Sequence, residues 1–169
     1  MSPPTDAAAR VRLLVLDVDG VLTDGRLYYG ARGETLKVFH VRDGLGLKLL
    51  AAAGVTIAVI SGRRSAMTAR RCRELGVRHL FQGVVDKLAA FQRLRGRLGV
   101  SAAACACVGD DVPDVPLMRE VGLSFAVADA HREARNAAHV ITHLPGGKGA
   151  VREVCDYLLE ARRHGAAAK

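Results

Sequence analysis

Short apolar runs that alternate with helix-forming segments are the feature that most constrains the fold of this chain. Each run is apolar along its length instead of alternating with polar positions, which is typical of strands covered on both faces. Strands that alternate with helices predict a parallel sheet with helices on both sides. The predicted strands are 11–17, 55–61, 78–83, 104–110, 123–129 and 139–142, and the predicted helices are 43–53, 63–75, 86–98, 114–121, 131–137 and 148–162.

One segment interrupts this alternation. Residues 26–40, "RLYYGARGETLKVFH", contain two β-like pieces around glycines and predict a hairpin inserted between the first strand and the first helix. The sequence shows no linker and leaves no room for a cap domain. We therefore expect a Rossmann-like, doubly wound α/β fold with one domain over 11–162, a flexible N-terminus over 1–10 and a flexible tail over 163–169.

The charge of the chain narrows the class of ligand. Lys and Arg number 25 against 17 Asp and Glu, for a net charge of +8. The basic residues are scattered and no aromatic stacking platform accompanies them, which favours a small anionic ligand over nucleic acid. No apolar run approaches the roughly 20 residues of a membrane helix, and the start lacks a signal-peptide pattern, so we expect a cytoplasmic protein without a membrane partner.

Polar residues follow several of the predicted strands at their carboxyl ends, where ligands bind in sheets of this kind. Taken singly, each has an ordinary explanation: Ser61 as a helix cap, Lys87 as an exposed charge, and the "DVDG" stretch as a turn. Their convergence on one rim predicts a catalytic site instead. The residues at this rim are Asp17, Asp19, Ser61, Arg63, Lys87, Asp110, Asp111 and Asp114.

The carboxylates at the rim need a cation to offset their repulsion. Oxygen ligands without a neighbouring His or Cys suit a hard ion, and Mg²⁺ is the cofactor we expect. Asp17 and Asp110 would supply side-chain oxygens, and Asp19 its backbone carbonyl. Asp114 would orient Lys87 or a metal-bound water, while Asp111 would do the same or cap the next helix.

This arrangement predicts a phosphoryl-transfer reaction. Asp17 would attack phosphorus and form an aspartyl-phosphate. Asp19 would protonate the leaving alcohol and later deprotonate the hydrolytic water. Ser61 and Lys87 would hold the phosphoryl oxygens, where charge develops in the transition state.

Four stretches carry a resemblance to a known superfamily. "DVDGVLTDG", "VISGR", "DK" and "GDDVPD" resemble the four motifs of the haloacid dehalogenase superfamily of phosphatases. Longer stretches such as "GDDVPDVPLM" and "GGKGAVREVCDYLL" resemble its capless branch, the 3-deoxy-D-manno-octulosonate 8-phosphate phosphatases, over about residues 11 to 162. The resemblance implies hydrolysis of that ester to the free sugar acid and phosphate, a step in lipopolysaccharide biosynthesis.

The resemblance also implies ligand contacts and an assembly. Mg²⁺ would bind Asp17, Asp19 and Asp110. Relatives of this branch form homotetramers in which the hairpin of one subunit helps close a neighbour's site, and we expect "GGKGAVRE", or the tail after it, to contribute to that covering. The implied substrate contacts are Asp19, His40, Val41, Arg42, Asp43, Gly44, Lys48, Arg63, Arg71 and Lys87.

Three positions depart from the pattern of this branch, which leaves the exact sugar open. His40 stands in place of Asn, and Lys48 and Lys148 in place of Arg. The stretch "QGVVDKL" is also similar to 2-keto-3-deoxynononate 9-phosphate phosphatases, whose tail tends to carry an acidic residue in the GGxG element. Lys148 therefore favours the eight-carbon substrate.

Two functions without catalytic turnover are also compatible with parts of the sequence. A phosphoacceptor signalling module also combines clustered Asp residues with a Lys, but its phosphorylated Asp lies on a middle strand, where this chain has Ser61. A catalytically silent oligomerisation module is the second, and the intact Asp17, Asp19 and Lys87 argue against it.

Overall fold

The computed structural model describes residues 6–167 and contains a six-stranded parallel sheet. The strand order is β5-β4-β1-β6-β7-β8, so the chain winds first to one side of β1 and then to the other. This confirms the predicted doubly wound α/β architecture. The strands are β1 (Leu13–Leu16), β4 (Thr56–Ser61), β5 (His79–Gln82), β6 (Cys105–Gly109), β7 (Leu123–Ala126) and β8 (Val140–Ile141).

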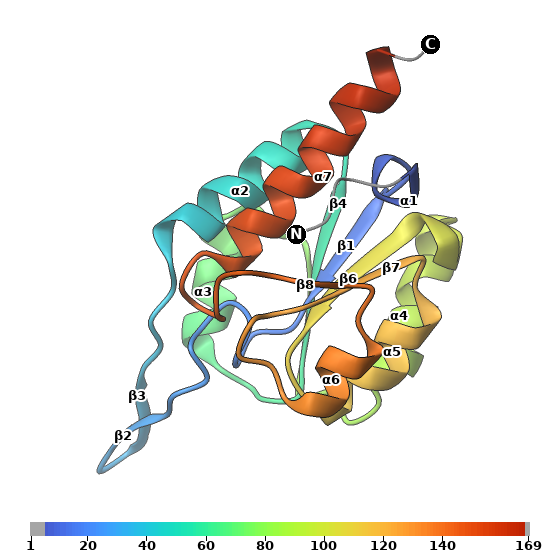
Figure 1. The fold of residues 1–169 in the computed structure, drawn as a ribbon. Coiled ribbons are helices and arrows are strands. Elements are labelled where there is room, and N and C mark those ends of the chain that lie inside the picture. The colour runs from blue at the N-terminus through green and yellow to red at the C-terminus, as the bar shows by residue number, and fades with distance from the viewer. Residues whose placement is uncertain (1–5, 168–169) are drawn as a thin grey trace.

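Helices cover both faces of the sheet. Figure 1 shows α2, α3 and α7 on one face and α4, α5 and α6 on the other. None of the helices between residues 6 and 167 combines the length and apolarity that crossing a bilayer takes. The helices are α1 (Asp6–Ala9), α2 (Val41–Ala52), α3 (Ala66–Glu74), α4 (Lys87–Leu98), α5 (Val115–Glu120), α6 (Arg132–Ala137) and α7 (Ala150–Ala167), with 3₁₀ turns at Ala102–Ala104 and Val112–Asp114.

The core follows from the apolar runs noted in the sequence. Every residue of β1, β6 and β7 is buried, because helices pack on both sides of these strands. Large side chains from the helices and strands fill the two interfaces, among them Phe91 of α4 and Phe125 of β7. The rigid sheet that results holds the carboxyl ends of its central strands side by side.

The predicted hairpin is present. Strands β2 (Tyr28–Gly30) and β3 (Gly33–Leu36) pair antiparallel and project away from the sheet (Figure 1). Several apolar side chains of this segment are exposed, including Tyr29 at 65% and Val38 at 48%.

Both ends of the described chain contain helical residues where the sequence predicted flexible termini. The expected flexible N-terminus, 1–10, includes α1, whose Ala8 is fully buried, and the expected flexible tail, 163–169, includes the last turn of α7. Helix α1 packs against α7. Arg162 anchors α7 by donating hydrogen bonds to the carbonyls of Val11 and Ala53 at 3.1 and 2.9 Å, so the helix continues past it. Residues 1–5 and 168–169 lie outside the described residues.

The start of the first long helix also differs from the prediction. A helix was expected over 43–53, whereas α2 begins at Val41 with His40 as its N-cap, so Asp43 lies in the first turn and does not cap the helix. The Asp43 side chain instead accepts a hydrogen bond of 2.8 Å from the backbone N–H of Arg152, in the first turn of α7. This carboxylate therefore joins two helices that are distant in the sequence.

Candidate active site

The candidate site lies at the carboxyl ends of the three central strands. Asp17 directly follows β1, Asp110 directly follows β6, and Ser61 is the last residue of β4. Because β4 and β6 are the two neighbours of β1 in the sheet, the three side chains meet at one edge.

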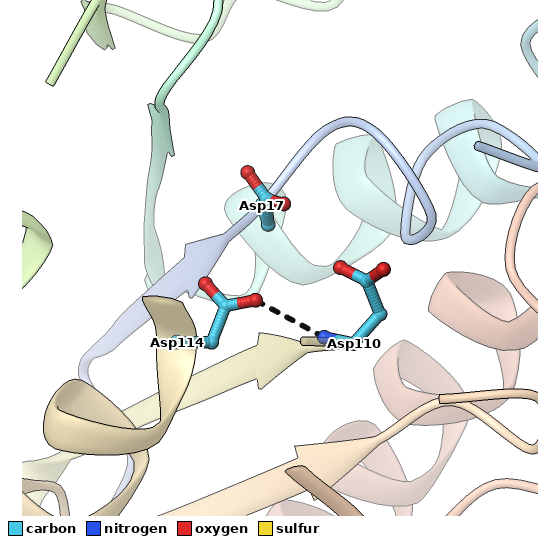
Figure 2. A group of neighbouring side chains, drawn as sticks. All are labelled: Asp17, Asp110 and Asp114. Atoms are coloured by element: carbon cyan, nitrogen blue, oxygen red, sulfur yellow. Dashed lines mark hydrogen bonds between the residues drawn. The ribbon is translucent and has the colours of Figure 1, made fainter. Parts of the chain in front are cut away.

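Three carboxylates converge there. Asp17, Asp110 and Asp114 each offer an oxygen, and these oxygens all lie within 4.8 Å of one another. Figure 2 shows that they come from separate segments, with Asp114 accepting a 3.1 Å hydrogen bond from the backbone N–H of Asp110. Burial, reinforced by the charge of Asp114, raises the pKa of Asp17 to about 6. Burial and the charges of Asp17 and Asp114 raise the pKa of Asp110 to about 8.

Lys87 is the cation nearest to this cluster. Its Nζ lies 2.7 Å from Asp114 Oδ1 and 3.0 Å from Asp17 Oδ1, and its side chain is 6% exposed. Burial alone would lower the pKa of Lys87, but the charges of Asp17 and Asp114 outweigh it and raise the pKa, so the ammonium stays charged. The side chain is held at the first position of α4, which Asp86 caps by accepting from the N–H of Ala89.

A single cleft of about 340 Å³ joins these groups to the other residues predicted at the rim. The sequence-predicted residues that line it are Asp17, Asp19, Ser61, Arg63, Lys87, Asp110, Asp111 and Asp114. Gly62, Val84, Val85 and Pro113 complete the wall. The cleft is open to solvent and large enough for a phosphoryl group with part of the molecule attached to it.

Asp111 and Asp114 also stabilise the local backbone. Asp111 caps the 3₁₀ turn Val112–Asp114 by accepting from the N–H of Val112 at 2.7 Å. The Asp114 carboxylate accepts a hydrogen bond from the Asp111 backbone N–H and another from Lys87 Nζ. Of the two roles predicted for Asp111, capping a helix or orienting Lys87 or a metal-bound water, the structure contains the capping contact.

The Asp19 carboxylate turns away from the three clustered acids. It forms an ion pair with Lys37, and its second oxygen lies 3.8 Å from Nε of Arg63. Glu34 contacts both cations, at 3.2 Å from Lys37 Nζ and 3.4 Å from an Arg63 Nη. The sequence analysis did not identify Lys37 or Glu34, because a charged residue in a predicted exposed hairpin carries no signal of burial.

The remaining predicted substrate contacts lie outside this cleft. They form a second group around the start of α2, where the Arg71 guanidinium lies against Gly44 so closely that a Cβ there would be 2.4 Å from it. The side chain of Asp43 is buried and engaged with α7, whereas Val41 is 77% exposed. The predicted contact residues absent from the cleft wall are His40, Val41, Arg42, Asp43, Gly44, Lys48 and Arg71.

The loop that contains the GGKG stretch packs against the loop that follows Asp19. The N–H of Gly147 donates to the Val21 carbonyl at 3.0 Å, and a Cβ on Gly146 would lie 1.7 Å from the Gly20 carbonyl oxygen. Only glycine fits at such an approach. Lys148 is exposed at this loop.

The acidic cluster fits a hard divalent cation. All three side chains donate oxygen, as Mg²⁺ and similar ions require. Asp110 Oδ1 is buried and has no hydrogen-bond partner among residues 6–167. Burial and the neighbouring acidic charges raise the pKa of Asp17 and Asp110, so a positive charge in the cluster would stabilise their ionised forms. A bound cation would satisfy both conditions. Asp19 is not one of the three clustered acids, and its carboxylate pairs with Lys37.

The chain is similar in sequence to a known family of hydrolases. A family model described as haloacid dehalogenase-like hydrolase matches residues 76–152. The 3-deoxy-D-manno-octulosonate 8-phosphate phosphatase of Salmonella typhi is 50% identical over 155 residues, which span 92% of this chain and 82% of the relative.

Two solved structures share the fold closely. The Moraxella catarrhalis 3-deoxy-D-manno-octulosonate 8-phosphate phosphatase, in complex with magnesium, phosphate and KDO, is 42% identical with a TM-score of 0.91, covering 96% of this chain and 93% of that one. The cobalt-bound deoxy-D-mannose-octulosonate 8-phosphate phosphatase of Haemophilus influenzae is 44% identical, also with a TM-score of 0.91, covering 93% and 92%.

Proposed function

This chain belongs to the 3-deoxy-D-manno-octulosonate 8-phosphate phosphatases of the haloacid dehalogenase superfamily, and we propose that it hydrolyses that ester to the sugar acid and phosphate. It is a phosphoric monoester hydrolase, and the reaction fits a place in lipopolysaccharide biosynthesis. The observation that carries the proposal is the single cleft in which Asp17, Ser61, Lys87 and Asp110 meet. None of these residues is close to all the others in the sequence, so the fold alone brings them together.

Asp17 is the nucleophile. Its carboxylate forms a bond to phosphorus as the bond from phosphorus to the leaving oxygen breaks, giving an aspartyl-phosphate and an alcohol. Asp19 supplies the proton that the leaving oxygen takes. In the second step Asp19 accepts a proton from water, the water oxygen bonds to phosphorus, and the bond to Asp17 breaks, which releases phosphate and restores the Asp17 carboxylate and the protonated Asp19.

Lys87 and Ser61 bind the transferring group. The Lys87 ammonium, already 3.0 Å from Asp17, lies where it neutralises phosphoryl oxygens in the transition state. The Ser61 hydroxyl accepts from the backbone N–H of Arg63 at 3.3 Å and keeps its own hydrogen for a phosphoryl oxygen. Asp114 holds Lys87 through the 2.7 Å contact between its Oδ1 and the Lys87 Nζ.

Asp17 and Asp110 would hold Mg²⁺ through their side chains, together with the backbone carbonyl of Asp19. The ion supplies charge neutralisation between the nucleophilic carboxylate and the incoming phosphate dianion. Support for this choice comes from the acidic cluster of this chain and from relatives solved with magnesium and with cobalt.

The substrate is a small sugar-acid phosphate. Arg63 lies on the wall of the cleft and is 39% exposed, so its guanidinium can reach the carboxylate or hydroxyls of a ligand. The second group of basic and polar residues, around His40, Lys48 and Arg71, extends the surface beyond the phosphoryl position. A homotetramer that brings this second group against a neighbour's cleft would make it part of a binding site.

The test is a phosphate-release assay in the presence of Mg²⁺ with eight- and nine-carbon sugar-acid phosphates. We expect the eight-carbon ester to give the higher kcat/KM. The Asp17→Asn variant keeps the shape of the side chain but removes the nucleophile, so its turnover should fall by at least about 10³-fold. Chelation should abolish activity, and added Mg²⁺ should restore it. Wild-type rates in the Asn variant would exclude Asp17 as the nucleophile.

A further inference from the structure

The inserted hairpin ends in a buried cation that the reaction described above does not use. Lys37 directly follows β3, and its side chain is 1% exposed. Its neighbours Leu36 and Val38 are each 48% exposed, so the chain turns this one side chain inward. A buried ammonium is costly unless carboxylates pair with it, and here two of them do.

The partners of Lys37 connect the hairpin to the loop after β1, which contains Asp19. Its Nζ pairs with Asp19 on one side and lies 3.2 Å from Glu34 Oε1 on the other. Glu34 belongs to β3 and also contacts Arg63, so it fixes Lys37 from within the hairpin.

We propose that Lys37 is a positioning residue that holds the Asp19 carboxylate in the orientation needed for proton transfer to and from the substrate oxygen. This inference rests on the proposed function, because it assigns Lys37 a task in the proton-transfer step. It also means that the hairpin contributes to the active site of its own subunit, because Lys37 at its end orients the Asp19 carboxylate.

Two observations favour Lys37 over Arg63 for this task. Arg63 lies 3.8 Å from Asp19 and is 39% exposed, whereas Lys37 makes a direct ion pair and is almost fully buried. Arg63 also lines the cleft and has access to substrate, whereas Lys37 does not line it and can act on the reaction only through Asp19.

The test uses the Lys37→Met variant, which keeps the length of the side chain without its charge. Arg32→Met is the matched control, since Arg32 is an exposed cation on the same hairpin. Both variants and the wild type are assayed for kcat/KM with p-nitrobenzyl phosphate and p-nitrophenyl phosphate, which have similar size. The benzyl alkoxide needs a proton to leave and the nitrophenolate does not.

We expect Lys37→Met to lose at least about tenfold in kcat/KM with the benzyl ester and less than about threefold with the phenyl ester, because only the first depends on Asp19 as an acid. Arg32→Met should match the wild type with both. An equal loss of kcat/KM with both esters would show that Lys37 has only a structural role and would contradict the proposal. No loss with either ester would also overturn it. The Glu34→Gln variant, which loosens Lys37 but leaves it charged, should show the same selectivity more weakly.

A crystal structure of Lys37→Met gives a readout that is independent of activity. The Asp19 carboxylate should rotate away from its wild-type position, and an unchanged Asp19 would contradict the proposal. If the wild-type enzyme hydrolysed no phosphate ester at all, the proposed function would fail, and the orientation of Asp19 would still decide the role of Lys37.

Discussion

At the scale of single residues, the site gathers carboxylates at a partly buried position, where their ionised forms are destabilised. Asp17, Asp110 and Asp114 lie together in a partly buried cluster, with Lys87 as their principal cation. Such a cluster stores unfavourable energy in the metal-free protein, because repulsion and desolvation both penalise the ionised carboxylates. The same property prepares the site to bind a divalent ion and then a phosphate dianion.

The pH dependence of stability should reveal this stored energy. The pKa of Asp110 is raised from 3.8 to about 8 in the folded chain, so the folded state holds a proton that the unfolded state has lost. The free energy of unfolding in chelator should therefore decrease as pH rises between about 4 and 8, by up to about 1.4 kcal/mol per pH unit for each such proton.

Chemical denaturation across this pH range measures the effect. The Asp110→Asn variant cannot ionise at this position and should show a shallower dependence, which separates Asp110 from the other titrating groups. Added Mg²⁺ should stabilise the wild type most at the alkaline end of the range, where the carboxylates are free to bind it. A variant with the same slope as the wild type would contradict the assignment.

At the scale of elements, long apolar runs were predictable and short or polar features were not. The six strands lie within two residues or fewer of their predicted starts. The pattern is clearest for β1, β6 and β7, which are buried along their whole length. Helix α1 is too short to show a helical period, and its burial comes from packing on α7. The inward turn of Lys37 and the contact of Asp43 with α7 depend on tertiary structure, which a local pattern does not contain.

The candidate site also contains residues whose position was predictable from the sequence and residues whose position was not. Residues at strand ends, such as Asp17, Ser61 and Asp110, were predictable because a parallel sheet brings its carboxyl ends to one edge. The position of the second group around His40 and Arg71, outside the cleft, was not. His40 lies at the start of α2 and Arg71 on α3. Their positions relative to the cleft depend on how these helices pack in the folded chain, which the local sequence does not contain.

The approach of two loops gives a prediction at this scale. A Cβ on Gly146 would lie 1.7 Å from the Gly20 carbonyl oxygen, and neither backbone can yield without moving the loop after Asp19. Gly146→Ala should therefore lower both the thermal unfolding midpoint and kcat. Gly96→Ala is the control, since this exposed glycine inside α4 has nothing within 4 Å of a new Cβ. It should stabilise the protein by about 0.5–1 kcal/mol and leave kcat unchanged.

At the scale of the whole molecule, one side of the subunit carries an unusual amount of exposed apolar surface. The hairpin and the outer face of α2 contribute it together, next to the second group of predicted substrate residues. The exposed side chains are Leu27, Tyr29, Leu36, Val38, Val41, Leu45 and Leu49. Contiguous apolar surface on a folded chain is typical of a protein interface. A second copy of this chain is the partner we expect, in a homotetramer.

Disrupting this surface should dissociate the assembly. Leu45, which is 51% exposed on the outer face of α2, offers a position that does not line the cleft. In Leu45→Glu a charge would be buried at the subunit contact without a partner, so light scattering should detect a mass near that of the 18.0 kDa monomer in place of the roughly fourfold larger tetramer.

The activity of the dissociated form then tests whether neighbouring subunits complete the site. Loss of contacts from a neighbour should raise KM for the sugar-acid phosphate more than for p-nitrophenyl phosphate, because the small ester needs only the cleft within one subunit. Ile141→Glu alters an apolar residue of β8, at the sheet edge away from β4 and β5, and should leave the tetramer and both KM values unchanged. A wild-type chain that is monomeric in solution would refute the assembly, and the cleft of a single subunit would then have to bind the whole substrate.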